Sequence, residues 1–465
     1  MRRAAKLSTG ASLLTAIFFC LAASLHAQVF GPTPPSSPVA ATQTLSPSQS
    51  LVTNQTPTPL TLEEALRLAN AQASSYQEAL LSERIAAEEV KQAHAAFLPK
   101  VSATASYIYT SPLIGTGAPG EQSFIANNAI NEYEALGNVT GDLDLSGRLR
   151  ATLARNRALL AAAHAGTDVA RRALAQSVVE AYYGLALATA ERVAAEQNLA
   201  AAGEFERITS LLLSGGEVAP VDLTRAQLQN ATRRDELERA RVSEAVAGGS
   251  LRVLVGYDFL RPIATTDLIL AMPTDSEAQR FTAATISERP EFAQFDAQRR
   301  AAQQEIRIAR ADRLPQLNYS FNGGFDSNSL NPAPLKEHTG VSATLNLSIP
   351  IFDWGASRSK ERQARLRVAV VENERAQAAR GFSQQFYAAQ AQANSAAARI
   401  KLAGVAVTQA QNSLDASIAR YRAGEAQIIE VTDAQTTLVT QKSALYQAIF
   451  EYQTALGRLR LAAGR

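Results

Sequence analysis

The sequence predicts a mainly helical protein made of two repeats, with a smaller β part of four strands. One sharp turn occurs twice, in "LSGGEVAPVDLTRAQ" (213–227) and in "YRAGEAQIIEVTDAQ" (421–435), and the two copies align without a gap at an offset of 208 residues. Long segments repeat apolar or small residues about every 3.5 positions, which is typical of a coiled coil. Shorter segments alternate apolar and polar residues, which is typical of strands.

The first 27 residues have the pattern of a secretory signal. A positively charged start precedes a mostly apolar stretch over 11–23, which is shorter than a membrane helix, and Ala27 offers a small residue for cleavage. The alternative is a lipoprotein signal ending at Cys20, although two bulky phenylalanines stand directly before that cysteine. Lipidation of Cys20 stays open.

Composition narrows the classes of function. The leader holds three basic and no acidic residues, so the chain after it has a formal charge of −1 instead of +2, and no basic patch indicates nucleic acid. The single cysteine lies in the leader, which excludes disulfides and thiolate chemistry from the rest. His94, His164 and His338 are isolated and lack metal-ligand spacing. The sequence therefore predicts no enzyme, metal or cofactor.

The chain divides into a leader and two repeats. The predicted parts are a signal over 1–27, a disordered segment over 28–59, a first repeat over 60–256, a linker over 257–285 and a second repeat over 286–465. The repeats end in "LVG" (254–256) and "ALG" (455–457), where the offset is 201. The first return helix therefore has seven extra residues, which are two helical turns and keep the same face inward.

Each repeat contains one long helix. We expect these helices to run from near Gly147 to Gly215 and from near Gly355 to Gly424, with lengths of roughly 100 Å. In the first repeat, shorter helices over about 61–98 and 220–256 should pack end to end beside the long one.

The coiled-coil seam of the long helices follows alternating steps of four and three. In the second repeat these steps visit twelve apolar or small residues: Phe382, Phe386, Ala389, Ala393, Ala396, Ile400, Ala403, Val407, Ala410, Leu414, Ser417 and Tyr421. The same register in the first repeat, from Leu174 to Leu213, is clearly broken only by Arg192 and Glu206. Small residues at alternate seam positions predict close helix packing.

Four segments alternate as amphipathic strands. They are expected at about 100–110, 136–146, 316–325 and 340–351, and ten residues suit a tilted strand that crosses a bilayer. The alternative is a sheet packed on a soluble core, but the hairpins over 111–135 and 326–339 offer no second layer. Four strands cannot close a barrel, and open edges in lipid leave backbone groups unpaired. Three chains would supply a twelve-stranded barrel with a water-filled middle.

These pieces together resemble the TolC-like outer-membrane efflux family. The resemblance rests on the opening "LTLEEALRLAN", the "LP" joins before the strands, "IPIFDWG" before the second long helix, and the duplicated glycine turns. It covers residues from about 60 to 460 and implies a homotrimer, with an outer-membrane barrel continued by a helical tunnel in the periplasm. It also implies an exit duct for an inner-membrane pump, such as one of the RND or ABC type, joined through a periplasmic adaptor.

The resemblance assigns the two turns to the periplasmic mouth of the tunnel. Glycine tolerates the positive φ that such a turn needs. The tips that would meet the adaptor are Gly215, Gly216, Glu217, Gly424 and Glu425. For the two glutamates, a favourable position at the positive end of the following helix is the alternative reading.

Four further residues match positions at the tunnel entrance of relatives. Glu430 and Asp433, three apart on one helix face, would form an acidic ring that favours cations, or an ordinary solvated face. Asp222 and Tyr421 would hold the entrance closed by a hydrogen bond, although Tyr421 also fits the seam. Relatives with the full lock have an arginine where this chain has Ala426. The sequence therefore does not decide whether the entrance is closed at rest.

The alternative function is a soluble periplasmic coiled-coil adaptor or scaffold. The passive channel is preferred because it explains both the strands and the helices. Neither the cargo nor the particular pump and adaptor follows from the sequence.

Overall fold

The computed structural model describes residues 59–111, 130–266, 268 and 277–464. All of these lie in the second of two units into which the chain divides, 1–56 and 57–465. The predicted signal, and all but the last residue of the predicted disordered segment over 28–59, lie outside the described residues.

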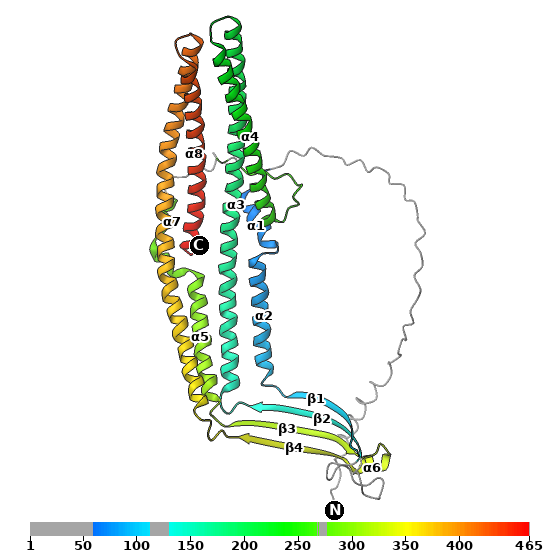
Figure 1. Cartoon of the computed structure of the whole chain (residues 1–465). Helices are drawn as coiled ribbons and strands as arrows, with labels where there is room; N and C mark the ends of the chain where they lie inside the picture. The colour runs from blue at the N-terminus through cyan, green and yellow to red at the C-terminus, as the bar shows by residue number, and fades with distance from the viewer. Residues whose placement is uncertain (1–58, 112–129, 267, 269–276, 465) are drawn as a thin grey trace, which may run out of the picture. The chain divides into compact units, whose positions relative to one another are not determined.

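Two long helices of equal length dominate the fold (Figure 1). α3 (Arg148–Ser214) and α7 (Ala356–Arg422) each contain 67 residues. Each follows a glycine in the left-handed region, Gly147 with φ 79° and Gly355 with φ 84°. The prediction of one long helix per repeat is confirmed.

The first helix of the sequence is broken in two, whereas one helix over about 61–98 was expected. α1 (Leu62–Ala71) and α2 (Ser75–Ala95) are separated by three residues. The Ser74 side chain accepts a hydrogen bond from the Gln77 amide and so begins a second helix. The Gln77 side chain donates to the Asn70 carbonyl at 2.7 Å, which satisfies an acceptor near the end of α1.

The shorter helices pack beside the long ones. The remaining ones are α4 (Pro220–Val255), α5 (Pro290–Ala311) and α8 (Ile428–Ala462). The expectation of seven extra residues in the first return helix is wrong, because α8 continues through "ALG" (455–457), where Gly457 keeps a helical conformation. α4 and α8 contain 36 and 35 residues, and the left-handed glycines after them, Gly256 and Gly464, are again 208 apart. α3 packs against α2 and α4, and α7 packs against α5 and α8, as the repeat predicts. α3 also contacts α5 and α8, which joins the two repeats within one chain.

The predicted seam is the core of the helical part. All twelve positions on α7 are buried or half-buried, and so are the corresponding positions on α3. The two polar exceptions on α3 find partners on α4. Arg192 lies 2.6 Å from a carboxylate oxygen of Glu244, and Asn230 donates to Glu206 at 2.5 Å. Arg192 and Glu206 are half-buried, and these partners offset their loss of contact with water.

The four strands form one antiparallel sheet in the order β1-β2-β3-β4. They are β1 (Lys100–Tyr109), β2 (Asn131–Leu143), β3 (Gln316–Ser327) and β4 (Thr339–Ser348). Their register joins Val101, Val139, Phe321 and Ala343 in one row, and the next row joins Ser102, Asn138, Asn322 and Ser342. Apolar and polar residues therefore occupy opposite faces, as predicted.

The second strand starts and ends earlier than the predicted range of about 136–146. β2 stops at Leu143 because Asp144 is used to begin α3. The strand instead extends back to Asn131, so part of the predicted hairpin over 111–135 is strand. Residues 112–129 of that hairpin lie outside the described part. The hairpin between β3 and β4 contains a short helix, α6 (Pro332–Glu337).

The segment after α4 returns to the start of the first repeat. Leu60 forms a parallel bridge with Thr265, and the Tyr182 hydroxyl donates to the Leu60 carbonyl at 2.8 Å. Two short 3-10 helices, η2 (Ala278–Arg280) and η3 (Ala283–Glu288), precede α5. α5 begins at Pro290, four residues later than the predicted boundary at 286, because proline favours the first helical position. Within the described ranges, no helix has both the length and the apolar character to cross a membrane.

Candidate functional site

The two helical hairpins, α3–α4 and α7–α8, end in turns of the same hydrogen-bond pattern. In the first, the amides of Gly216 and Glu217 donate to the carbonyls of Leu213 and Leu212. In the second, Gly424 and Glu425 donate to Tyr421 and Arg420 in the same way. Both are Schellman motifs, in which a left-handed residue just past the helix satisfies its last carbonyls. The sequence repeat is therefore a repeat of one helix-ending device.

Only one glycine in each turn has the left-handed conformation. Gly216 has φ 78° and Gly424 has φ 75°. Gly215 has φ −79°, an ordinary helical value, and its counterpart in the second turn is Ala423 with φ −80°. The expectation that Gly215 supplies positive φ is therefore wrong, because the turn needs that conformation only at the residue after the helix cap.

The two tip glutamates are exposed and lie before the return helices, not inside them. α4 begins at Pro220 and α8 at Ile428, so Glu217 and Glu425 each stand three residues earlier. Acids of the first turn are instead Asp222 and Glu430, which share the third helical position. These acids, six residues after the glycine, lie where the positive end of the helix dipole favours a carboxylate.

The two residues of the expected acidic ring differ in their surroundings. The Arg420 guanidinium lies 3.0 Å from a carboxylate oxygen of Glu430 and also donates to the Glu425 carbonyl. Asp433 is exposed, and no ion pair to its carboxylate occurs among the described residues. Glu430 is therefore partly neutralised within its own hairpin, whereas Asp433 presents a free charge.

The two residues of the expected lock have separate partners within the described chain. Asp222 lies 3.8 Å from the Arg225 guanidinium on its own helix. Tyr421 is buried, with its ring centroid 5.3 Å from that of Phe205 and its hydroxyl 3.5 Å from the Thr209 hydroxyl. Thr209 donates to the Phe205 carbonyl, so the Tyr421 hydroxyl is the donor toward Thr209.

Contacts between the two hairpins involve residues that the sequence did not single out. Gln229 donates to Gln435 at 2.6 Å, and Arg233 donates to Thr436 at 3.3 Å, which joins α4 to α8. Phe205 belongs to the same core cluster as Tyr421. Phe205 lies one residue before the seam position at 206, so heptad spacing alone does not find it.

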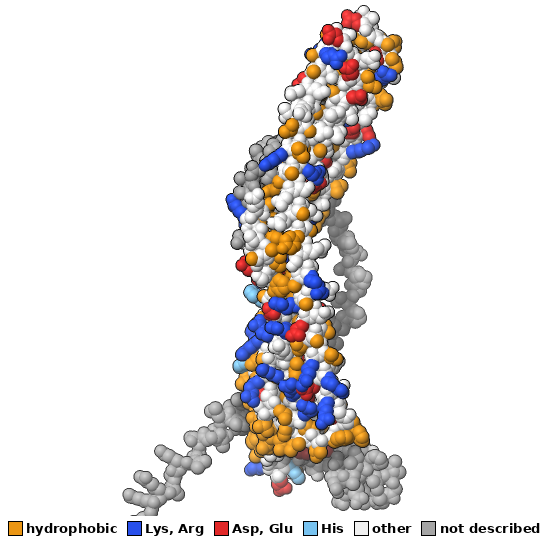
Figure 2. Space-filling model, turned by 90° about the vertical axis from the view of Figure 1, so that its left-hand side faces the viewer, with side chains coloured by type: hydrophobic (Ala, Val, Ile, Leu, Met, Phe, Trp, Pro, Cys, Tyr) orange, Lys and Arg blue, Asp and Glu red, His pale blue; other side chains and the backbone are white. Residues whose placement is uncertain are grey.

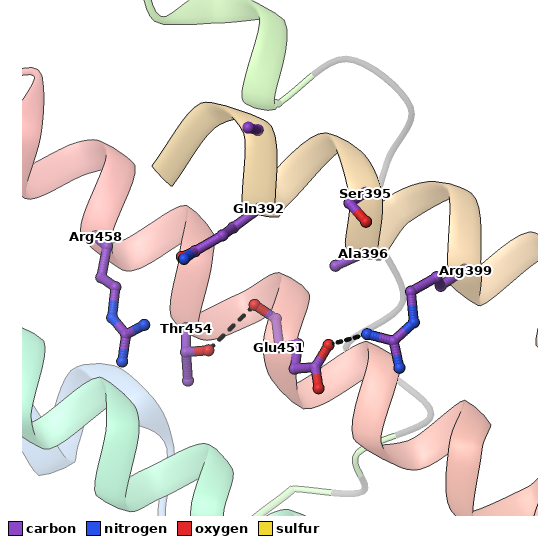
Figure 3. Close-up of a pocket in the computed structure, with 8 residues that line it drawn as sticks. Gln392, Ser395, Ala396, Arg399, Glu451, Thr454 and Arg458 are labelled. Atoms are coloured by element: carbon purple, nitrogen blue, oxygen red, sulfur yellow. Dashed lines mark hydrogen bonds and ion pairs between the residues drawn. The ribbon is translucent and has the colours of Figure 1, made fainter. Parts of the chain in front are cut away.

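A hollow of about 510 Å³ between α7 and α8 is lined mainly by polar and charged side chains (Figure 3). Its ion pair joins Arg399 to Glu451, and the Thr454 hydroxyl donates to the Glu451 carbonyl. Arg458 reaches Glu180 on α3 at 2.8 Å. These polar groups bind one another and hold helices together.

The comparison with protein families decides the class. The model of the family "Outer membrane efflux protein" matches residues 64–257 and 283–465, which are most of the described chain. The chain belongs to the outer membrane efflux protein family. The two matched ranges coincide closely with the two repeats. This membership confirms the predicted class of outer-membrane efflux channel and its localisation, and it sets aside an enzyme and a soluble adaptor.

Relatives in this family are distant in sequence. The alkaline protease secretion protein AprF of Pseudomonas aeruginosa is 28% identical over 294 residues, which cover 62% of this chain and 60% of AprF. The pyoverdine export outer membrane protein OpmQ of the same species is 24% identical over 84% of each chain. Among solved structures, CusC matches with a TM-score of 0.76 at 20% identity, over 87% of this chain and 92% of its own. That likeness confirms the fold.

Proposed function

We propose that three copies of this chain form a passive exit duct through the outer membrane. The four strands of each copy would contribute to a twelve-stranded barrel, and the helices would continue it as a tunnel in the periplasm. The duct would have no energy source of its own and would act with an inner-membrane pump through a periplasmic adaptor. Family membership and the fold of the known channels support this proposal.

The proposed assembly rests on helix contacts that one repeat makes within the chain and the other repeat does not. The repeat makes α7 the counterpart of α3, α8 the counterpart of α4, and α5 the counterpart of α2. Within one chain α3 packs against α8 and α5 of the other repeat. The equivalent contacts of α7, against α4 and α2, require a neighbouring chain.

The surfaces left over for those contacts are apolar. One stripe on α4 has near-heptad spacing and consists of exposed residues: Val221, Leu228, Val242, Val246 and Val253. α7 exposes Leu366, Val370, Tyr387, Leu402 and Val405. Burying such stripes against each other stabilises association by about 25 cal/mol for each Å² of apolar surface.

The sheet supports the same assembly. β2 pairs with β3 across the two repeats. The equivalent pairing would join β4 to β1 of a neighbouring chain. β1 and β4 are the two edges of the sheet within one chain. A sheet in lipid needs its edges paired, because each unpaired backbone group costs several kcal/mol.

For the hairpin tips we propose contact with the adaptor. Glu217 and Glu425 are exposed beside the two left-handed glycines, and each would occur three times around the mouth. Glu430 and Asp433 would line the entrance as an acidic ring. AprF and OpmQ are named for protease secretion and pyoverdine export, so both secretion and efflux are proposed as roles for this chain.

For closure we propose that Tyr421 holds the two helical hairpins of one chain together. Its ring packs on Phe205, and its hydroxyl lies at the long limit of a hydrogen bond to Thr209. The ring contact should therefore matter more than the hydroxyl. Asp222 would act separately from this contact, since its half-buried side chain lies 3.8 Å from the Arg225 guanidinium on its own helix.

Single-channel recording in a planar bilayer tests the duct and its closure. The purified protein should insert and conduct, and Tyr421→Ala should raise the conductance more than Tyr421→Phe. The conductance of Asp222→Ala shows whether Asp222 contributes to closure separately from the contact of Tyr421 with Phe205. A protein that is released by carbonate washing as a water-soluble monomer, and that never conducts, contradicts the proposed function.

A further inference from the structure

The junctions where the sheet meets the two long helices differ chemically between the repeats. At an offset of 208, Arg150 in α3 corresponds to Arg358 in α7, and Asp144 corresponds to Phe352. In the first junction the Arg150 guanidinium lies 2.8 Å from the Asp144 carboxylate and also donates to its carbonyl. In the second junction the acid that begins the helix is Asp353, one position later in the alignment. No carboxylate pairs with Arg358 among the described residues.

An exposed apolar group takes the place of the missing ion pair. Ile351, Phe352 and Trp354 have exposed fractions of 93%, 70% and 90%. The rings of Phe352 and Trp354 meet edge to face with centroids 4.8 Å apart. So large an apolar group on the surface marks a binding or membrane contact.

The backbone at Trp354 is held in an unfavourable conformation. Trp354 has φ 55°, and it is the only described residue other than glycine with a positive φ. A bulky residue in this region costs roughly 1–2 kcal/mol. The turn is fixed by Asp353, which accepts hydrogen bonds from the amides of Gly355 and Ser357. In the first repeat the counterpart of Trp354 is Ser146, which avoids this cost.

A hollow of about 300 Å³ lies at the second junction, beside these aromatic residues. It is lined by Arg313, Pro350, Ile351, Phe352, Asp353, Gly355, Ser357 and Arg358. Arg313 is paired with Glu361 at 3.0 Å, and both oxygens of Asp353 accept amide bonds. Arg358 is therefore the lining arginine that has no carboxylate partner among the described residues.

We propose that this junction, formed by Arg358, Phe352 and Trp354, binds the phosphate headgroup of an anionic phospholipid in the periplasmic leaflet. Guanidinium groups bind phosphate well, and aromatic rings lie at the headgroup level of membranes. Figure 2 shows Lys and Arg side chains gathered over the helices close to the hydrophobic surface at the sheet end. The inference rests on the proposed placement of the strands in the membrane.

Trp354 makes the test direct, because it is the only tryptophan of the chain. The purified protein is reconstituted in two kinds of phosphatidylcholine bilayer. One contains acyl-brominated phosphatidylglycerol, and the other contains the same fraction of acyl-brominated phosphatidylcholine. Quenching of Trp354 should indicate an about five-fold preference for phosphatidylglycerol, the effect of one guanidinium near an anionic surface. Arg358→Gln should bring the preference close to one, and the matched variant Arg150→Gln should leave it unchanged.

Three results would overturn the inference. The first is equal quenching by both lipids in the unsubstituted protein. The second is an equal loss of the lipid preference in the Arg358→Gln and Arg150→Gln variants. The third is a preference abolished by millimolar inorganic phosphate at constant ionic strength, which would indicate a site for free anions. Channel conductance of the same preparations separates the two proposals: a conducting protein without lipid preference contradicts this inference alone.

Discussion

At the scale of single residues, each of the two hairpin turns depends on one glycine. Gly216 and Gly424 have positive φ in open space, where an added Cβ meets no atom within 4 Å. The need for glycine there comes from the backbone and not from crowding. Around each glycine the exposed acids are free to serve binding, because they do not close the turn with their side chains.

We expect Gly216→Ala to destabilise the first turn by about 1 kcal/mol, since alanine is disfavoured in the left-handed region. Gly215→Ala is the matched control, because Gly215 has helical φ and alanine already occupies its counterpart, Ala423. Hydrogen exchange of the Glu217 amide, which bonds to the Leu212 carbonyl, reads out the opening of the turn. Equal exchange in both variants would refute the assignment.

The proposed acidic ring gives a second residue-level prediction. Replacing Glu430 and Asp433 by their amides removes two carboxylates from each chain and should lower the preference for cations. Arg420→Gln should raise it, because the Arg420 guanidinium partly neutralises Glu430. Reversal potentials in asymmetric salt measure both effects. Unchanged selectivity in both variants would indicate that these residues lie outside the conducting path.

At the scale of elements, each long helix starts from an aspartate that satisfies its first amides. Asp144 accepts from Leu149 and Arg150, and Asp353 accepts from Gly355 and Ser357. Partial burial raises the pKa of Asp144, but the bonds from the Arg150 guanidinium and the two amides outweigh it and hold the pKa below its usual value. Bonds from the Ser357 hydroxyl and amide lower the pKa of Asp353.

These shifts predict how the helix starts respond to acid. A carboxylate with a lowered pKa in the folded state stabilises the helix start above its unfolded pKa of about 3.9, and this contribution is lost as the pH falls through the folded pKa. Protection of the first amides of α3 and α7 from hydrogen exchange should therefore decrease below about pH 4. Asp144→Ala should cost about 1 kcal/mol. An acid response of α3 that Asp144→Asn leaves unchanged would contradict this account.

Periodicity predicted the elements well and their interruptions poorly. The heptad seam and the alternating strands came directly from the sequence, because one face of each element is buried or apolar. The break between α1 and α2 has neither glycine nor proline, and it depends on side-chain bonds of Ser74 and Gln77. At the site, the glycine turn was predictable, whereas the contact of Tyr421 with Phe205 depends on which helices meet.

At the scale of the whole molecule, the proposal depends on one symmetry argument. Two repeats in one chain leave contacts that only a further chain completes, both in the sheet and in the helices. The Gln176 side chain on α3 donates to the Thr454 carbonyl on α8. At the offset of 208 their counterparts in the other repeat are Gln384 on α7 and Val246 on α4, and Val246 is 65% exposed.

Cross-linking at this counterpart pair tests the central claim most directly. The only cysteine lies in the predicted leader, so Val246→Cys with Gln384→Cys can be made without removing others from the rest of the chain. A short bis-maleimide applied to membranes should join the double variant into covalent trimers, whereas Gln176→Cys with Thr454→Cys should cross-link within one chain. Covalent trimers would support the ring of three chains. A double variant that stays monomeric, while the internal pair reacts, would contradict it.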